Sequence, residues 1–440
     1  MPKPAQPRPR IRSLSKPPLP RNAWVLLAIN LTNSVAFFSV GSLINPYLRN
    51  LGMSAAFVGL YFAVLSIVQG LASFAGGFLA DTIGRRRVWI AGKVMQIMAY
   101  AILASGLRGS TILIAAVLTG AGQIGIGAMN ALQADAAEDR WRATYLAVLM
   151  TVNGLTGVIA PLAGGLLADR FGANWALIAI LPLLMVVVRL ISILEEKARL
   201  TASPAAPNEK AAAASLRARL QTSRRRLAEL AGGIIHGPYP RAAIGLLVWS
   251  LLSGVTNGVL FLSLPLMLRD RFGMGYTGVA AMQTALSLGA VATTILGARV
   301  ADRIGRRRVI LAATSLAAGL IFFVPQLTSA TQLYGAIFLI SLVINSATGA
   351  LAAAQMESVS QHARATYGGV VNGLVALGAA IGNLSGGLVY RVEPMLTMYI
   401  AAAGFALGAI FLTIFLQETS ATVKAQRAGD VSRAADGDSG

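Results

Sequence analysis

Long apolar runs recur along the whole chain and are separated by short polar segments. A helix that crosses a bilayer needs about 20 mainly apolar residues, and runs of this length occur about twelve times. The pattern therefore predicts an all-α membrane protein. Its predicted transmembrane helices span residues 22–47, 55–80, 88–107, 110–136, 142–168, 173–194, 241–268, 276–301, 308–328, 331–358, 364–390 and 394–416.

The composition fits a membrane environment and excludes several kinds of site. Hydrophobic residues make up 55% of the chain and charged residues 12%, whereas soluble domains carry roughly 25% charged residues. The chain has no cysteine and two histidines, which excludes disulfides, thiolate metal sites and a multi-histidine metal cluster. No nucleophile–base pair and no phosphate-binding loop is visible. We therefore expect neither an enzyme nor a bound cofactor.

The net charge of +20 comes from Lys and Arg residues that lie between the apolar runs. Basic clusters occur before residue 22, at 85–87 and 303–308, and in the central segment after residue 194. Because cytoplasmic loops are enriched in Lys and Arg, we expect both termini in the cytoplasm and the helices in the inner membrane of a bacterium. The basic residues then face lipid headgroups, and no nucleic-acid partner is expected.

The two halves of the chain repeat each other. The segment 76–87 ends in Asp-Thr-Ile-Gly-Arg-Arg-Arg and recurs at 297–308 as Asp-Arg-Ile-Gly-Arg-Arg-Arg, with an offset of 302 − 81 = 221. Duplicated six-helix halves are a transporter architecture. The predicted parts are a disordered basic tail at 1–21, six-helix bundles at 22–194 and 241–416, a cytoplasmic linker at 195–240 and a disordered tail at 417–440. Leucines at helical spacing in the linker indicate an interfacial amphipathic helix; a solvated linker is the alternative.

The repeated loop combines small residues, an acid and arginines where two predicted helices meet. The small residue at 77 is predicted to allow close helix approach. An aspartate at the membrane boundary is costly without a partner, and a helix N-terminus offers free amides and a favourable dipole. We expect Asp81 to hold the start of the eleventh helix and Asp302 that of the fifth, which would latch the halves together on the cytoplasmic side. The residues of this gate motif are Gly77, Asp81, Gly84, Arg85 and Arg86, and in the second copy Asp302, Gly305, Arg306 and Arg307.

The loop and its repeat resemble the signature cytoplasmic loop of the major facilitator superfamily. The resemblance extends over about residues 22–416 in length, number of spans, central loop and duplication. It implies two bundles related by an axis normal to the membrane, with a cavity between them. It also implies transport by alternating access, in which the bundles rock against each other.

A second motif lies in the fifth predicted helix, at residues 156–165. It is similar to the antiporter motif of drug-efflux members of the same superfamily. Pro161 should kink the helix, and Gly164 and Gly165 should let a neighbouring helix pack closely. An ordinary packing face is the alternative. The arginine that many proton-coupled exporters carry in helix four is replaced here by Ala121.

The centre of the membrane is expected to hold no charged side chain, with Lys93 assigned to the inner end of its span. Amides occupy the mid-span positions instead. They can donate and accept hydrogen bonds, so they are predicted to line a neutral substrate cavity or to join helices. The four amides are Asn33, Gln123, Asn257 and Asn345.

Two carboxylates are expected at the inner ends of helices, Asp135 beside Arg142 and Glu357 beside Arg364. We interpret them as gate salt bridges or as proton carriers. An adjacent arginine favours the charged carboxylate. Any proton coupling should therefore require the pair to separate as the gate opens.

Together these features predict a secondary active transporter that exports small amphipathic or neutral compounds in exchange for protons. The alternative is an uptake carrier or facilitator for a neutral solute such as a sugar. The expected partners are the small-molecule substrate, membrane lipid and protons, and a monomer is expected.

Overall fold

The computed structural model describes residues 20–137, 139–194, 231–235 and 237–418. Within these ranges the side chains of residues 78, 81, 139, 140, 143, 294–299, 301, 302 and 365 are not described. The predicted tails and most of the predicted linker, with its amphipathic helix, lie outside the described residues.

The described chain is helical almost throughout, and its helices begin and end within a few residues of the predicted spans. The fourth predicted span is interrupted by a 3₁₀ turn, η1. The elements are α1 Arg21–Asn50, α2 Ala55–Ile83, α3 Arg85–Ala104, α4 Ser110–Ala121, η1 Gly122–Gly125, α5 Ile126–Asp135, α6 Asp139–Phe171, α7 Ala173–Ser192, α9 Pro240–Asp270, α10 Tyr276–Ile304, α11 Arg306–Phe323, η2 Val324–Gln326, α12 Ala330–Glu357, η3 Gln361–Ala363, α13 Arg364–Val392 and α14 Pro394–Phe415.

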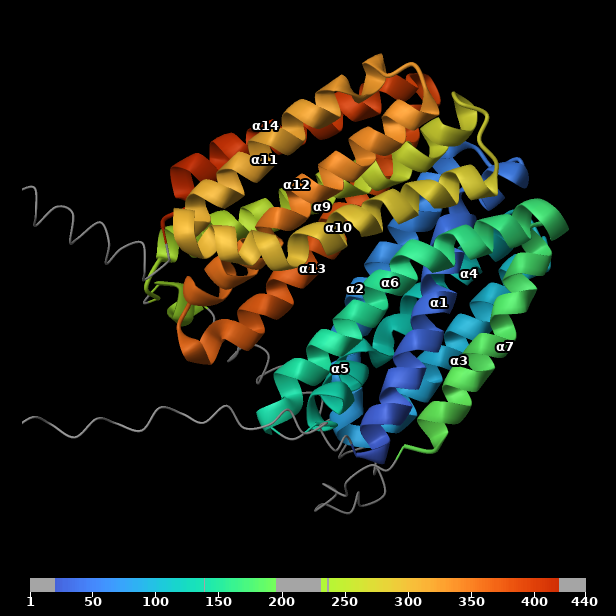
Figure 1. Cartoon of the computed structure of the whole chain (residues 1–440), viewed down its shortest axis with the longest axis horizontal. Coiled ribbons are helices and arrows are strands. Elements are labelled where there is room, and N and C mark those ends of the chain that lie inside the picture. The colour runs from blue at the N-terminus through green and yellow to red at the C-terminus, as the bar shows by residue number, and fades with distance from the viewer. Residues whose placement is uncertain (1–19, 138, 195–230, 236, 419–440) are drawn as a thin grey trace, which may run out of the picture.

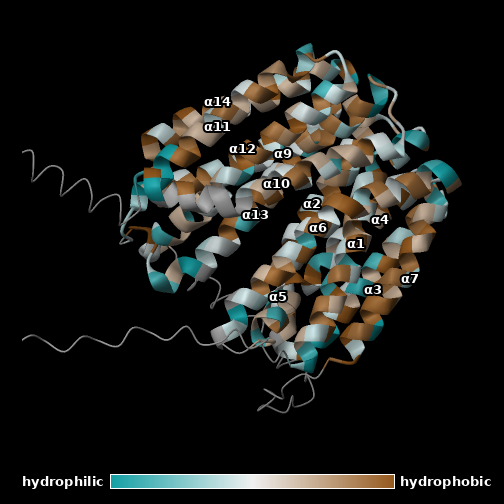
Figure 2. Cartoon of the chain, viewed as in Figure 1, coloured by the Kyte–Doolittle hydropathy of each residue, from teal (hydrophilic) through white to brown (hydrophobic). Residues whose placement is uncertain are grey.

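The outer surface of the helices is apolar. Among the described residues, 11 helices are long and apolar enough to cross a membrane. The helix α10 has 29 residues and is as long as these. Large side chains such as Leu71, Phe74 and Ile159 are exposed, where a soluble protein would carry polar groups. Hydrophilic colour gathers at the helix ends and hydrophobic colour along their lengths (Figure 2). The protein is therefore an integral membrane protein with many spans.

The helices form two bundles, α1 to α7 and α9 to α14, which lie side by side (Figure 1). Each bundle packs around apolar cores, for example around Leu43 and Leu177 in the first and Leu260 and Ile337 in the second. Two helix pairs make the most extensive contacts between the bundles, α2 with α13 and α6 with α10. These pairs are equivalent under the repeat, which confirms the prediction of two pseudo-symmetric six-helix halves.

The two ends of the molecule differ in how the bundles meet. We call the end with Gly84 and Gly305 the motif end, and the end where α1 and α9 finish the far end. A Cβ added at Gly59 would lie 3.0 Å from Cα of Gly387, and one at Gly70 would lie 3.0 Å from Cβ of Ala376. Within the described residues, close contacts of this kind between α2 and α13 extend from the far end to about the middle of α2, at Gly70. The bundles are therefore packed together at the far end.

Candidate functional site

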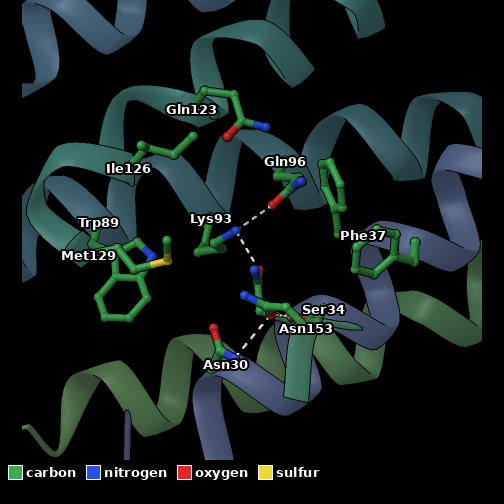
Figure 3. Close-up of a pocket in the computed structure, with 14 residues that line it drawn as sticks. Asn30, Ser34, Phe37, Trp89, Lys93, Gln96, Gln123, Ile126, Met129 and Asn153 are labelled. Atoms are coloured by element: carbon green, nitrogen blue, oxygen red, sulfur yellow. Dashed lines mark hydrogen bonds between the residues drawn. The ribbon is translucent and has the colours of Figure 1, made fainter. Parts of the chain in front are cut away.

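A cavity of about 240 Å³ lies within the first bundle. Side chains from α1, α3, η1, α5 and α6 surround it (Figure 3). Its lining combines aromatic rings, amides and one lysine, a mixture typical of a small-molecule site. The lining residues are Asn30, Asn33, Ser34, Phe37, Phe38, Trp89, Lys93, Gln96, Gly122, Gln123, Gly125, Ile126, Met129 and Asn153.

Lys93 occupies the middle of this pocket. It is the ninth residue of the 20-residue helix α3, and it is only 8% exposed. Its Nζ donates hydrogen bonds to Oδ1 of Asn33 over 2.6 Å and to Oε1 of Gln96 over 2.8 Å (Figure 3). The expectation of an uncharged membrane centre is therefore wrong. It failed because α3 begins at Arg85, earlier than the predicted start, which moves Lys93 from the end of the span to its middle.

A second polar group lies below Lys93 in Figure 3 and joins α1 to α6. Nδ2 of Asn30 donates to Oδ1 of Asn153 over 3.0 Å and to the carbonyl of Leu149 over 3.3 Å. Ser34 donates to the same amide oxygen of Asn153. The amide oxygen of Asn153 thus accepts two bonds, which fixes the orientation of its side chain beside the cavity.

The 3₁₀ turn η1 brings the fourth span against α3 at the level of Lys93. A Cβ at Gly92 would lie 2.5 Å from the carbonyl oxygen of Gly122, and one at Gly125 would lie 2.9 Å from Cα of Trp89. Only glycine permits such an approach of two helix backbones. The glycine-rich stretch of the fourth span therefore forms one wall of the pocket and carries Gln123 into it.

Polar contacts close the far end across the two bundles. The carboxylate of Asp169 accepts hydrogen bonds from the backbone N–H groups of Tyr276 and Thr277 at the start of α10, over 2.9 and 2.8 Å. Arg49 forms an ion pair with Asp270 over 3.0 Å. Since α1 and α6 belong to one bundle and α9 and α10 to the other, these bonds must break for the bundles to part here.

The sequence profile of the Major Facilitator Superfamily matches residues 26–282 and 246–435, which together cover most of the chain. The chain belongs to the major facilitator superfamily. The resemblance seen in the repeated loop is therefore confirmed, and the protein is a secondary transporter and not an enzyme.

Individual relatives of this superfamily member are distant. The multidrug resistance protein MdtH of Aeromonas hydrophila subsp. hydrophila is 27% identical over 148 residues, which are 33% of this chain and 37% of the relative. A POT family transporter solved with 5-aminolevulinic acid superposes with a TM-score of 0.72 at 12% identity, over 90% of this chain and 96% of that one. The human organic anion transporter MFSD10 superposes with a TM-score of 0.62 at 18% identity, over 89% and 100%. These two structural likenesses show the fold alone.

The superfamily loop motif forms ion pairs within each bundle. Arg85 pairs with Asp135 over 2.8 Å, and Arg306 pairs with Glu357. The pairs correspond under the repeat, because 306 − 85 = 221 and 357 − 135 = 222. The carboxylates were expected beside Arg142 and Arg364, which are neighbours along the chain. In the structure the motif arginines at the starts of α3 and α11 bind them instead, because helix ends that meet at the motif end bring these side chains together.

The remaining motif residues have distinct roles. Gly84 and Gly305 have φ angles of 97° and 103°, a region that favours glycine, and so they permit the sharp turns before α3 and α11. Arg86 and Arg307 donate to the carbonyls of Leu194 and Thr413 in their own bundles. Glycine at 77 was expected to allow close helix approach. A Cβ there would meet nothing within 4 Å, and the tight position is Gly76, where a Cβ would clash with the Ile124 carbonyl.

The side chains of Asp81 and Asp302 lie outside the described part, so their expected contacts with the eleventh and fifth helices stay predictions. An equivalent contact does occur at two other places that the sequence analysis missed. One is Asp169 at the start of α10. The other is Glu418, which accepts hydrogen bonds from the backbone N–H groups of Arg306 and Arg307 over 3.2 Å each. Both are acids just after an apolar span, a signal that could have found them.

The motif of the fifth span contacts helices of both bundles. A Cβ added at Gly164 would lie 2.9 Å from Cβ of Ser39 in α1, and one at Gly165 would lie 2.8 Å from Cβ of Ala280 in α10. Pro161 lies within α6, which continues to Phe171. The two adjacent glycines thus let α6 pack closely against α1 of its own bundle and against α10 of the opposite bundle.

The four predicted cavity amides divide into two pairs. Asn33 and Gln123 line the pocket. Asn257 and Asn345 instead donate to carbonyls of their own helices, those of Ser253 and Ser341, over 2.8 Å each. The pocket therefore lies in the first half alone, and the second-half amides lie outside its lining.

Proposed function

We propose that this superfamily member exports small amphipathic compounds in exchange for protons. The observation that carries the proposal is the pocket lining, in which Phe37, Phe38 and Trp89 face the same space as amides and a lysine. Aromatic walls bind the apolar body of a ligand, and a few polar groups fix its orientation. The name of the relative MdtH, a multidrug resistance protein, supports the same direction of transport.

We place the motif end and both termini in the cytoplasm, in the inner membrane of a bacterium. The arginine clusters at 85–87 and 306–308 support this placement, since positive residues favour the cytoplasmic side. The far end is then the periplasmic gate, closed by Asp169 and by the Arg49–Asp270 pair. Substrate enters the pocket from the cytoplasm and leaves after these contacts break.

Proton coupling is assigned to the acids at the motif end. Asp135 and Glu357 each bind an arginine of their own bundle. In this proposal each carboxylate takes up a proton after its arginine has moved away, as the gate opens. Asp81 and Asp302 would latch the motif end when it closes. Rocking of the bundles then links protonation to the gate.

An uptake carrier or facilitator for a neutral solute such as a sugar is the second candidate. The amides of Asn30, Asn33, Gln123 and Asn153 favour it, because they can bind hydroxyl groups. Lys93 favours the first candidate, since a charged ammonium is costly in a membrane and a neutral solute does not offset its charge.

The test compares cells with and without the gene for retention of a fluorescent amphipathic compound, followed by transport in proteoliposomes with an imposed pH gradient. The proposal expects lower retention with the gene and uphill transport that stops when the gradient is dissipated. Higher retention with the gene would establish uptake. Transport that does not depend on the pH gradient would show that the protein is a facilitator.

A further inference from the structure

We infer that Lys93 is the recognition group for a negatively charged headgroup, so that the substrates are amphipathic organic anions. The inference rests on the proposed transport of amphipathic compounds and specifies their charge. It is drawn from the position of the lysine, its partners and the composition of the pocket around it.

Lys93 lies where a charge is expensive. It is in the middle of a membrane helix and is almost fully buried, and ionisable groups at such positions are costly unless they are paired. Ionisable residues at such depths commonly mark substrate or ion pathways. Its neighbours in the lining are the amides and aromatic rings of a ligand pocket.

The partners of Lys93 are neutral. Amide oxygens of Asn33 and Gln96 accept two hydrogen bonds, whereas an ammonium group has three donors. None of the 14 lining residues is a carboxylate. By contrast, Arg85 and Arg306 at the motif end each have an acid within reach. The amides solvate the ammonium but leave its charge uncompensated, so the described pocket lacks a counter-charge that a ligand can supply.

The surroundings hold the ammonium in place and suit an aromatic anion. Gln96 donates through Nε2 to the hydroxyl of buried Tyr100 over 3.0 Å, which turns its Oε1 toward Lys93. Trp89 is one helical turn before Lys93 and lines the same cavity. A ligand whose carboxylate, sulfonate or phosphate binds Lys93 can thus rest its apolar body on an indole ring.

The second half of the chain lacks this site. The residue equivalent to Lys93 is Thr314, since 93 + 221 = 314, and its hydroxyl donates to the carbonyl of Ile310 in its own helix over 2.7 Å. The lysine is therefore a departure from the repeat. This asymmetry matches a pocket that is built from the first bundle alone.

A thiol reporter tests the charge of the pocket without a known substrate. The chain has no cysteine, so Gln123→Cys introduces a single thiol in the lining. The thiol is labelled in separate experiments with anionic sulfonatoethyl methanethiosulfonate and with its cationic trimethylammonium analogue. The ratio of the anionic to the cationic labelling rate should fall at least about tenfold when Lys93→Gln is added. Lys93→Arg should keep the ratio. Arg189→Gln, which removes an exposed charge of α7 in the same bundle, should also leave it unchanged.

A binding measurement then tests substrate charge directly, using 2-naphthoate, 2-naphthamide and 2-naphthylmethylamine on the purified protein. The naphthoate should bind at least about tenfold more tightly than the amide, and Lys93→Gln should remove this preference. An unchanged labelling ratio, a reporter that never reacts, or a panel in which the anion has no advantage would overturn the inference. If the protein prefers the anion but shows no gradient-driven export, the inference about substrate charge stands and the proposed exchange with protons is refuted.

Discussion

Asp169, near the end of α6, accepts a hydrogen bond over 2.9 Å from the backbone N–H of Tyr276, the first residue of α10. A second bond to the N–H of Thr277 makes this carboxylate a cap of α10. Because α6 and α10 belong to different bundles, a helix N-terminus, with its positive dipole end, holds the far end closed.

Removing this charge should shift the protein toward the state with an open far end. Asp169→Asn keeps the size of the side chain but weakens charge-assisted bonds, at a cost of about 1–2 kcal/mol. The population of the open state should rise roughly 5- to 30-fold. The measurement is the labelling rate of a cysteine at Asn45, which lies buried beside the carbonyl of Leu262 across the bundles. An unchanged rate would show that Asp169 contributes nothing to closure.

The adjacent glycines of α6 should tolerate no side chain at the bundle interface. In Gly165→Ala the new Cβ would lie 2.8 Å from both Cβ of Ala280 and Cα of Thr277, so the bundles must shift apart. We expect transport to be strongly reduced while expression is retained. Gly319→Ala in α11, where a Cβ meets nothing within 4 Å, is the matched control. Equal transport by both variants would show that close packing of α6 against α10 is not needed for transport.

Proton coupling should depend on Asp135 and Glu357 together. Replacement of both by Asn and Gln removes the two carboxylates that pair with Arg85 and Arg306, so uphill transport driven by a pH gradient should disappear while downhill exchange persists. The control is Glu393→Gln, which removes a carboxylate that caps α14 at the far end, away from the two acids under test, and should keep uphill transport. Vesicles with an imposed gradient provide the measurement. Full gradient-driven transport by the double variant would exclude these acids as proton carriers.

The two equivalent amides should differ in their effect on binding. Gln123 lines the pocket, whereas Asn345 bonds to its own helix, although 345 − 123 = 222 makes them counterparts. Gln123→Leu should weaken substrate binding by about tenfold through loss of one hydrogen bond, and Asn345→Leu should change it far less. Titration of the purified variants with a transported compound measures both. A larger effect of Asn345→Leu would place the site between the bundles instead.

Much of the fold follows from the sequence alone. Apolar runs of membrane length and the repeated loop predict the helices, their order and the two halves, since a bilayer allows few other arrangements. The interruption at η1 was missed because a 3₁₀ turn leaves the apolar pattern intact. The close approach of Gly92 and Gly122 in the structure shows that the turn brings the fourth span against α3.

The candidate site was less predictable than the fold. Sequence reasoning selected Asn33 and Gln123 but overlooked Lys93, because its depth depends on where α3 begins. Lys93, Gln96 and Tyr100 lie at helical spacing on one face of α3, and this polar face in an apolar span was the available signal. The partners of Asp135 and Glu357 could not be read from the chain, since ion pairs depend on which helix ends meet in space.

Transport requires the two bundles to separate at the far end. Asn50 at the end of α1 bonds to the hydroxyl of Tyr276 at the start of α10. Cysteines at these two positions can therefore be joined through two disulfides by a short bis-methanethiosulfonate reagent in this otherwise cysteine-free chain. Transport of a substrate by the cross-linked protein in proteoliposomes is the most direct measurement. Transport should stop on cross-linking and return when the disulfide links are reduced. Undiminished transport by the fully cross-linked protein would contradict it.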